Sequence, residues 1–115
     1  MNERRRFQRY KVSLEVEYHV ENDVDIQATA RTFNISGGGI SLPLNRAISP
    51  GKKIRLNIKV PTEDREIKAV GRVVWKRPVN LNASPEEDAG IKFLNMDRDS
   101  AETLTGYIQT ISEAA

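Results

Sequence analysis

Alternating hydrophobic and polar residues run through most of the chain and predict short β-strands. Between residues 11 and 20 every second residue is hydrophobic, which is the period of a strand with one buried and one solvent-facing side. Turn-forming glycine, proline, asparagine and aspartate residues separate this segment from later ones. The same reasoning predicts further strands at about residues 24–33, 40–44, 53–60, 65–76 and 89–94.

The predicted strand at residues 65–76 is hydrophobic on both sides, which suits a strand that is covered on both faces. Val70 and Val74 lie on one face. The other face carries Ile67, Ala69, Gly71, Val73 and Trp75. The polar residues 78–88 that follow are predicted to form a loop.

The tail of the chain changes to a helical period. Asp99 with Glu102 resembles a capping box, and Asp97 is a competing cap. The helix is expected to plug one end of the sheet or to pack on its outside, since a lone amphipathic helix needs a partner. Its hydrophobic stripe has the spacing i, i+3, i+4 and i+7 and consists of Leu104, Tyr107, Ile108 and Ile111.

Six short strands followed by one helix predict an all-β fold. The expected architecture is a six-stranded antiparallel barrel, closed or split, with a C-terminal α-helix. A length of 115 residues fits one such domain. The chain has no cysteine, no long apolar run and no signal-peptide pattern, so the predicted location is the cytoplasm.

Charge is distributed unevenly along the chain. Residues 1–11 contain five basic residues against one acidic residue, whereas acidic residues slightly outnumber basic ones in the rest. The sequence therefore divides into a basic N-terminal arm, residues 1–10, and a barrel domain with its helix, residues 11–115. The arm is expected to be flexible and to attract phosphates, acidic surfaces or anionic lipid.

The first of two motifs lies in this arm and reads Arg5-Arg6-Phe7-Gln8-Arg9. Guanidinium groups suit bidentate contacts with a phosphate or with the O6 and N7 atoms of guanine. Phe7 among them is a candidate hydrophobic anchor against the barrel. The alternative for this segment alone is a disordered basic leader.

The second motif, Asn34-Ile35-Ser36-Gly37-Gly38-Gly39, sits between two predicted strands. Glycines let a ligand approach the backbone, and the amide groups of such a turn can bind an anion. Asn34 and Ser36 add side-chain donors and acceptors. The alternative is an ordinary tight connection, because these residues are common in turns.

Together the two motifs resemble the signatures of the PilZ domain family, R-x-x-x-R and D/N-x-S-x-x-G. Arg5 and Arg9 fill the first pattern, and Asn34, Ser36 and Gly39 fill the second. Residues 71–75 and 90–93 also resemble later strands of that family. The resemblance covers nearly the whole chain.

The resemblance implies a receptor for cyclic di-GMP, which presents two phosphates and two guanines. Arg5 and Arg9 would clamp a phosphate and the Hoogsteen edge of a guanine. Asn34 and Ser36 would bond the other base or its ribose-phosphate edge, and Gly39 would permit close approach.

Two further residues are candidates by the same resemblance. Arg4 directly precedes the first motif, where it would stack on a second guanine and favour a pair of stacked ligands. Trp75 would stack on a guanine, and the alternative is a tryptophan of the barrel core.

The implied function is a receptor that passes the signal to a downstream effector protein when the ligand orders its arm. No enzyme and no cofactor is expected, because His19 is the only histidine and no set of acid, base and nucleophile is present. The first alternative is a nucleic-acid-binding barrel, disfavoured by the slightly acidic body and by Phe33, Phe93 and Tyr107 fitting core positions. The second is a protein-interaction barrel. The oligomeric state, monomer or weak dimer, stays open.

Overall fold

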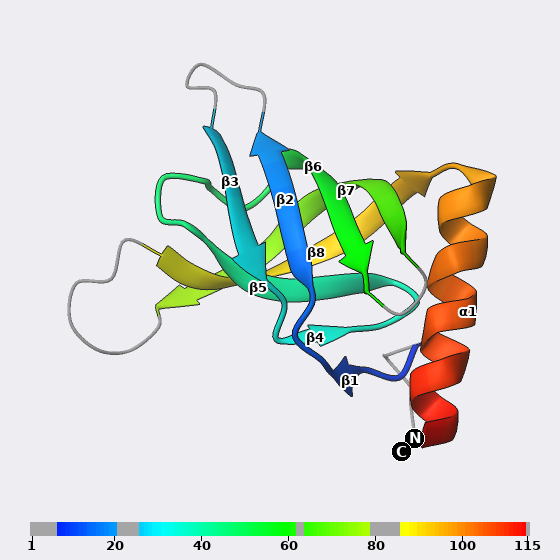
Figure 1. The fold of residues 1–115 in the computed structure, drawn as a ribbon. Coiled ribbons are helices and arrows are strands. Elements are labelled where there is room, and N and C mark those ends of the chain that lie inside the picture. The colour runs from blue at the N-terminus through cyan, green and yellow to red at the C-terminus, as the bar shows by residue number, and fades with distance from the viewer. Residues whose placement is uncertain (1–6, 21–25, 62–63, 79–85, 115) are drawn as a thin grey trace.

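The computed structural model describes residues 7–20, 26–61, 64–78 and 86–114, which form a curled antiparallel sheet and one helix (Figure 1). The all-β fold with a C-terminal helix is as predicted. The elements of the described residues are β1 (Tyr10–Lys11), β2 (Glu15–Val20), β3 (Ile26–Arg31), β4 (Asn34–Ile35), β5 (Gly39–Asn45), β6 (Lys53–Val60), β7 (Arg65–Pro78), β8 (Glu86–Met96) and α1 (Arg98–Ala114).

Eight strands replace the expected six, because the first predicted strand is divided into β1 and β2, and the second is interrupted at Thr32 and Phe33 and continues beyond its predicted end as β4. The sheet order is β1-β4-β5-β8-β7-β6-β2-β3. Between the paired segments β1/β4 and β2/β3, the first strand has three residues and the second has two, so the register shifts by one residue. This is the arrangement of a β-bulge, which breaks the ladder locally without separating the strands.

The side chain of Thr32 fills the interruption. Its hydroxyl accepts a hydrogen bond from the Leu14 N–H at 2.9 Å and donates one to the Val12 carbonyl at 2.6 Å. Backbone bonds from the Thr32 N–H to the Leu14 carbonyl and from the Val12 N–H to the Phe33 carbonyl join the two halves. The sheet therefore continues past the bulge and curls back on itself.

The predicted alternation holds for the core. Along β2 and β6, the hydrophobic side chains that point into the curled sheet are almost fully buried, whereas their neighbours are exposed or partly exposed. Phe33 is an exception to the predicted core, because 47% of it is exposed beside the bulge. The largest fully buried side chains of the core are Leu14, Ile35, Ile40, Leu42, Leu44, Ile48, Ile54, Ile58, Ile67 and Ile91.

The predicted face of β7 was wrong at its last position. Val73 is buried, but a bulge between Val73 and Trp75 inserts Val74, and the side chain of Trp75 is 37% exposed. An extra residue shifts the alternation by one, so Trp75 moves from the core face to the outer face. Since residues up to Val73 keep the predicted face, the error begins at the bulge.

The loop predicted at residues 78–88 was too long. Strand β7 extends to Pro78 and β8 begins at Glu86, with Pro78 opposite Glu87. Polar residues continue these strands because they pair across the ladder: Lys76 Nζ lies 3.3 Å from Glu87 Oε1, and Arg77 Nε lies 3.8 Å from Asp88 Oδ2.

The helix α1 lies beside the curled sheet next to β7, as Figure 1 shows, and two of its residues join the hydrophobic core that the strands enclose. Asp97 is its N-cap, since its Oδ1 accepts a hydrogen bond from the Ser100 N–H at 2.7 Å. The Ser100 hydroxyl in turn accepts a bond from the Lys68 N–H at 2.9 Å, which ties the first turn to β7. Leu104 and Tyr107 of the predicted stripe are buried. Within the described residues, no helix combines the length and apolar character needed to cross a membrane.

Candidate ligand-binding site

The fold brings the two sequence motifs together. Arg9 Nη1 donates a hydrogen bond of 2.6 Å to Asn34 Oδ1, although 25 positions separate the two residues. The cause is the pairing of β1 with β4, in which Lys11 lies opposite Asn34. Arg4 and Arg5 lie outside the described residues, so the structure places only one of the three predicted arginines.

Phe7 provides a second contact between the arm and the glycine motif. A Cβ added to Gly37 would lie 2.7 Å from Cδ1 of the Phe7 ring, and one added to Gly38 would lie 2.9 Å from Cδ2. The two glycines therefore leave the space in which the ring rests. The anchoring role expected of Phe7 matches this packing, with half of the residue still exposed to solvent.

Ser36 shapes the turn between β4 and β5. Its buried hydroxyl accepts hydrogen bonds from the N–H groups of Gly38 at 3.1 Å and Gly39 at 3.2 Å. These two amides are therefore directed at Ser36 and do not form the anion-binding turn expected from the glycines. A direct contact between Ser36 and a ligand stays a prediction.

Gly39 is required by the packing of β5 against β8. A Cβ at this position would lie 2.1 Å from the carbonyl oxygen of Ile91, a distance that no side chain tolerates. The sequence predicts that Gly39 permits close approach of a ligand, and this role stays a prediction. The close approach of the neighbouring strand already explains why a glycine is needed here.

Trp75 lies on the outer face and not in the core. Its indole rests over Gly90, where an added Cβ would meet the indole nitrogen at 2.2 Å. The guanidinium carbon of Arg77 lies 5.3 Å from the centre of the ring, which is the range of a cation–π contact. One side of the indole is thus supported by the sheet and another is approached by a cation.

Asn34 and Trp75 belong to one row across four strands, which we call the outer row. Asn34 pairs with Ser41, Ser41 with Gly90, and Gly90 with Trp75. Residues directly opposite each other project to the same face of a sheet. Three strand spacings separate the two ends, about 14 Å, and the residues between them are small. The row therefore has a polar group at one end and an aromatic ring at the other, with the buried Ser41 and Gly90 between them.

The sequence of this chain matches the model of a known protein family. The family model of the PilZ domain matches residues 3–110. The chain belongs to the PilZ domain family. No curated protein matches this sequence.

Solved structures share the fold of this PilZ domain. The inhibitor of motility MotI/DgrA from Bacillus subtilis superposes with a TM-score of 0.75 at 23% identity, covering 98% of this chain and 53% of that one. The PilZ domain of YcgR from Escherichia coli, solved with c-di-GMP, gives 0.75 at 12% identity and coverages of 97% and 94%. The MrkH–c-di-GMP complex from K. pneumonia gives 0.72 at 17% identity and coverages of 98% and 55%. This PilZ domain therefore spans about half the length of two of these three relatives.

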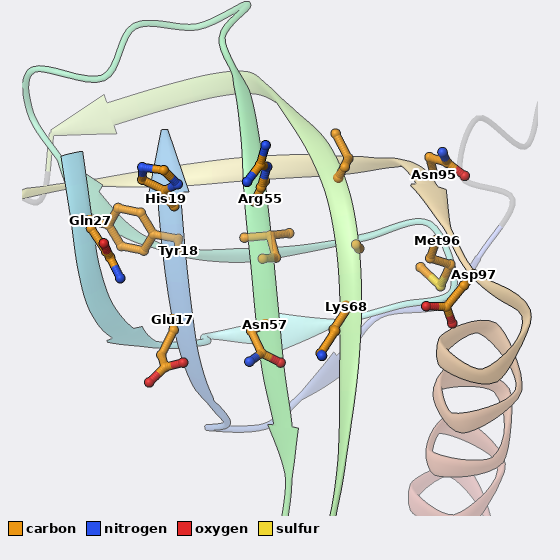
Figure 2. Close-up of a pocket in the computed structure, with 13 residues that line it drawn as sticks. Glu17, Tyr18, His19, Gln27, Arg55, Asn57, Lys68, Asn95, Met96 and Asp97 are labelled. Atoms are coloured by element: carbon orange, nitrogen blue, oxygen red, sulfur yellow. The ribbon is translucent and has the colours of Figure 1, made fainter. Parts of the chain in front are cut away.

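The PilZ domain has another pocket away from these residues. Figure 2 shows its lining side chains, which come from β2, β3, β6, β7 and the junction of β8 with α1. Its volume is about 560 Å³, and it contains the half-buried His19 beside Arg55. None of the predicted site residues lines it. In the part of the chain that the structure describes, no group of three or more acidic or histidine side chains is placed to hold a metal ion.

A smaller pocket of about 440 Å³ adjoins the glycine motif. Phe7, Tyr10 and Gly37 line one side of it, and Leu104 and Ile108 of α1 line the other. The sequence did not predict that Phe7 packs on the glycine turn and lines a pocket together with the helix. Only the hydrophobic residue among the arginines signalled that this part of the arm packs against the barrel.

Proposed function

We propose that this PilZ domain binds cyclic di-GMP between its arm and the outer row and acts as a receptor. The observation that carries the proposal is the hydrogen bond from Arg9 to Asn34, because it joins the two motifs into one site. The PilZ domain of YcgR was solved with c-di-GMP and MrkH as a c-di-GMP complex, which supports the same class of ligand here.

The chemistry of the residues suits the two halves of the ligand. Arg5 and Arg9 supply planar donors for a phosphate and a guanine Hoogsteen edge. Asn34 offers an amide to the second base or its ribose-phosphate edge. Trp75 presents a partly exposed ring on which a guanine can stack once the guanidinium of Arg77, which lies over that ring, moves aside. An arginine at position 4 would stack on a guanine of a second ligand.

Ser36 and Gly39 contribute in our proposal by holding the turn in shape. Ser36 fixes the backbone beside Asn34 through its hydroxyl, and Gly39 lets β5 lie against β8. A substitution of either residue would displace Asn34 from the arm. Direct hydrogen bonds of Ser36 to the ligand add to this role.

Signalling follows, in our proposal, when the ligand fixes the basic arm, residues 1–10, against the barrel domain, residues 11–115. Fixing about eight residues costs on the order of 10 kcal/mol. Several charge-assisted hydrogen bonds of about 1.5–3 kcal/mol each, together with stacking, offset that cost. The surface formed in this way would meet a downstream effector protein in the cytoplasm, without catalysis by the receptor itself.

A calorimetric titration tests the ligand. The chain is expected to bind cyclic di-GMP and to discriminate against GMP and cyclic GMP. Arg9→Ala should weaken binding by roughly 10- to 150-fold, which corresponds to about 1.5–3 kcal/mol for a charge-assisted contact. Arg65→Ala, an exposed arginine at the start of β7, removes the same charge away from the site and should leave binding unchanged.

Two outcomes would contradict the proposal. Equal binding of all three nucleotides would remove the specificity, and salt-dependent binding of generic oligonucleotides in its place would favour a nucleic-acid-binding barrel. The same titration gives the stoichiometry. One ligand per chain would contradict the stacking role of Arg4.

A further inference from the structure

We propose that Lys92 on β8 binds the second phosphate of the ligand. This inference rests on the proposed function and names a contact that neither sequence motif contains. Cyclic di-GMP has two phosphates, and the predicted clamp of Arg5 and Arg9 occupies one of them. The other needs a cation on the barrel side of the ligand, because an unpaired phosphate would lose its hydration without compensation.

The register of the sheet places Lys92 next to the outer row. Lys92 lies opposite Gly39 of β5 on one side and Arg72 of β7 on the other. It follows Gly90 by two positions, so both residues project to the same face of β8. On this face of the sheet, the pair of Lys92 with Gly39 is therefore next to the pair of Gly90 with Ser41, which separates Asn34 from Trp75.

The surroundings of Lys92 leave its ammonium accessible. Gly39 has no side chain to cover it, and the glycine turn lies alongside, since the Phe93 N–H donates to the Gly38 carbonyl at 2.9 Å. Lys92 is exposed to solvent. Among the described residues, its ammonium makes no ion pair with a carboxylate.

Three other cations of the sheet are engaged elsewhere. Lys59 lies within 3.7 Å of a Glu15 carboxylate oxygen, and the ammonium of Lys76 is buried against three backbone carbonyls and Glu87. Arg72, the partner of Lys92 across the ladder, donates to the Gly51 carbonyl at 2.9 Å and is directed away from the outer row. Lys92 and the exposed Lys11, which lies opposite Asn34, are therefore the cations beside the outer row that these contacts leave available to an anion, and Lys92 is the one on β8.

Strand β8 holds the backbone of Lys92 in a fixed position. It pairs with β5 on one side and β7 on the other, so its backbone at Lys92 is hydrogen-bonded from both directions. The barrel thus presents one phosphate-binding group before the arm closes. The second phosphate would be held by Lys92 while the arm arginines reach the first, which reduces the ordering that must accompany the initial contact.

The experiment compares three variants in calorimetric titrations with cyclic di-GMP. Lys92→Ala should weaken binding about tenfold and reduce the loss of affinity between low and high salt, because one charged contact is removed. Lys92→Arg keeps the charge and should retain most of the affinity. Lys68→Ala is the matched control, an exposed lysine of the same sheet about 13 Å along β7 from Arg72, and should bind as the unmodified chain does.

The outcomes separate this inference from the proposed function. Failure of the unmodified chain to bind cyclic di-GMP overturns both. Normal binding by the unmodified chain with equal affinities for Lys92→Ala and Lys68→Ala overturns the role of Lys92 alone. Thermal unfolding of the ligand-free variants should be unchanged, and a lowered midpoint for Lys92→Ala that accounts for its weaker binding would also contradict a direct contact.

Discussion

Gly39 shows how a single position of a binding motif can be set by packing. Its missing Cβ makes room for the Ile91 carbonyl oxygen, which is backbone and cannot rotate away. We expect Gly39→Ala to lower the free energy of unfolding by about 3 kcal/mol, since β5 and β8 must separate. Urea denaturation measures the loss. Gly106→Ala is the control, because a Cβ there meets no atom within 4 Å and should stabilise the helix by about 1 kcal/mol.

A decrease for Gly106→Ala as large as that for Gly39→Ala would contradict this account. It would mean that the loss of a glycine as such, and not the contact with Ile91, is responsible for the effect.

The buried phenol of Tyr18 makes the stability of the fold depend on pH in the alkaline range. Burial raises the pKa of its phenol, although the hydrogen bond from the Asn45 N–H lowers it in part, and the nearby Glu86 raises it further. A raised pKa in the folded state means that the phenolate is better tolerated in the unfolded chain. Its contribution to stability is therefore complete below about pH 10 and is lost as the pH rises through the pKa of the folded state.

Tyr18→Phe tests this dependence. The variant should lose about 1 kcal/mol at neutral pH, because the Asn45 N–H loses its acceptor, and its stability should fall less steeply above pH 10 than that of the unmodified chain. Part of the fall remains because burial also raises the pKa of Tyr107. Denaturation curves between pH 8 and 11 measure both effects, and parallel pH profiles would rule out the contribution of Tyr18.

At the scale of elements, the start of α1 depends on one carboxylate. The sequence left Asp97 and Asp99 as competing caps, and the structure selects Asp97, which accepts the Ser100 N–H. Asp97→Ala should therefore lower the free energy of unfolding by about 1 kcal/mol. Asp97→Asn should retain most of the stability, since asparagine also caps helices well. A larger loss for Asp99→Ala than for Asp97→Ala in chemical denaturation would reverse the assignment.

Local periodicity predicted most elements because each signal is contained within a few residues. The strands at residues 53–60 and 65–76 alternate strictly up to Val73, and the helical stripe with Leu104 and Tyr107 is buried as expected. The predictions were wrong where the pairing between neighbouring strands is interrupted or shifted by a bulge. The bulge at Val74 and the interruption beside Thr32 depend on the partner strand, so no pattern within one strand could reveal them.

At the scale of the whole molecule, Phe7 connects the arm, the glycine turn and α1. Its ring rests on Gly37 and Gly38 and lines a pocket with Leu104. We expect Phe7→Ala to weaken binding of cyclic di-GMP by roughly fivefold. The substitution removes about 1 kcal/mol of buried apolar contact, so the arm is no longer held against the glycine turn near Phe7. Phe7→Leu keeps part of the contact and should have an intermediate affinity in the same titration.

Amide hydrogen exchange at residues 7–11 gives an independent measurement of the same contact. The ligand should slow exchange there in the unmodified chain and less so in Phe7→Ala. Exchange that is indifferent to the ligand would contradict the closure of the arm, even if binding itself were observed.

The candidate site could be predicted in its parts but not in its assembly. Arg9, Asn34 and Trp75 were all identified by residue type and by resemblance to the PilZ family. Their arrangement depends on the pairing of β1 with β4 and on the succession of Ser41 and Gly90 across the sheet. The part played by Lys92 follows only from register, because nothing in its local sequence distinguishes it from other strand lysines.

The sequence by itself determined the class of fold, the helix and the family, since alternation, stripe spacing and motif spacing are all properties of neighbouring residues. The tertiary structure decided that Trp75 faces outward, that Ser36 and Gly39 shape the turn and that Arg9 meets Asn34. The physical reason is that these outcomes depend on strands brought together from distant parts of the chain. Hydrogen-bonded register and the space left by missing side chains set them, and both exist only once the sheet has formed.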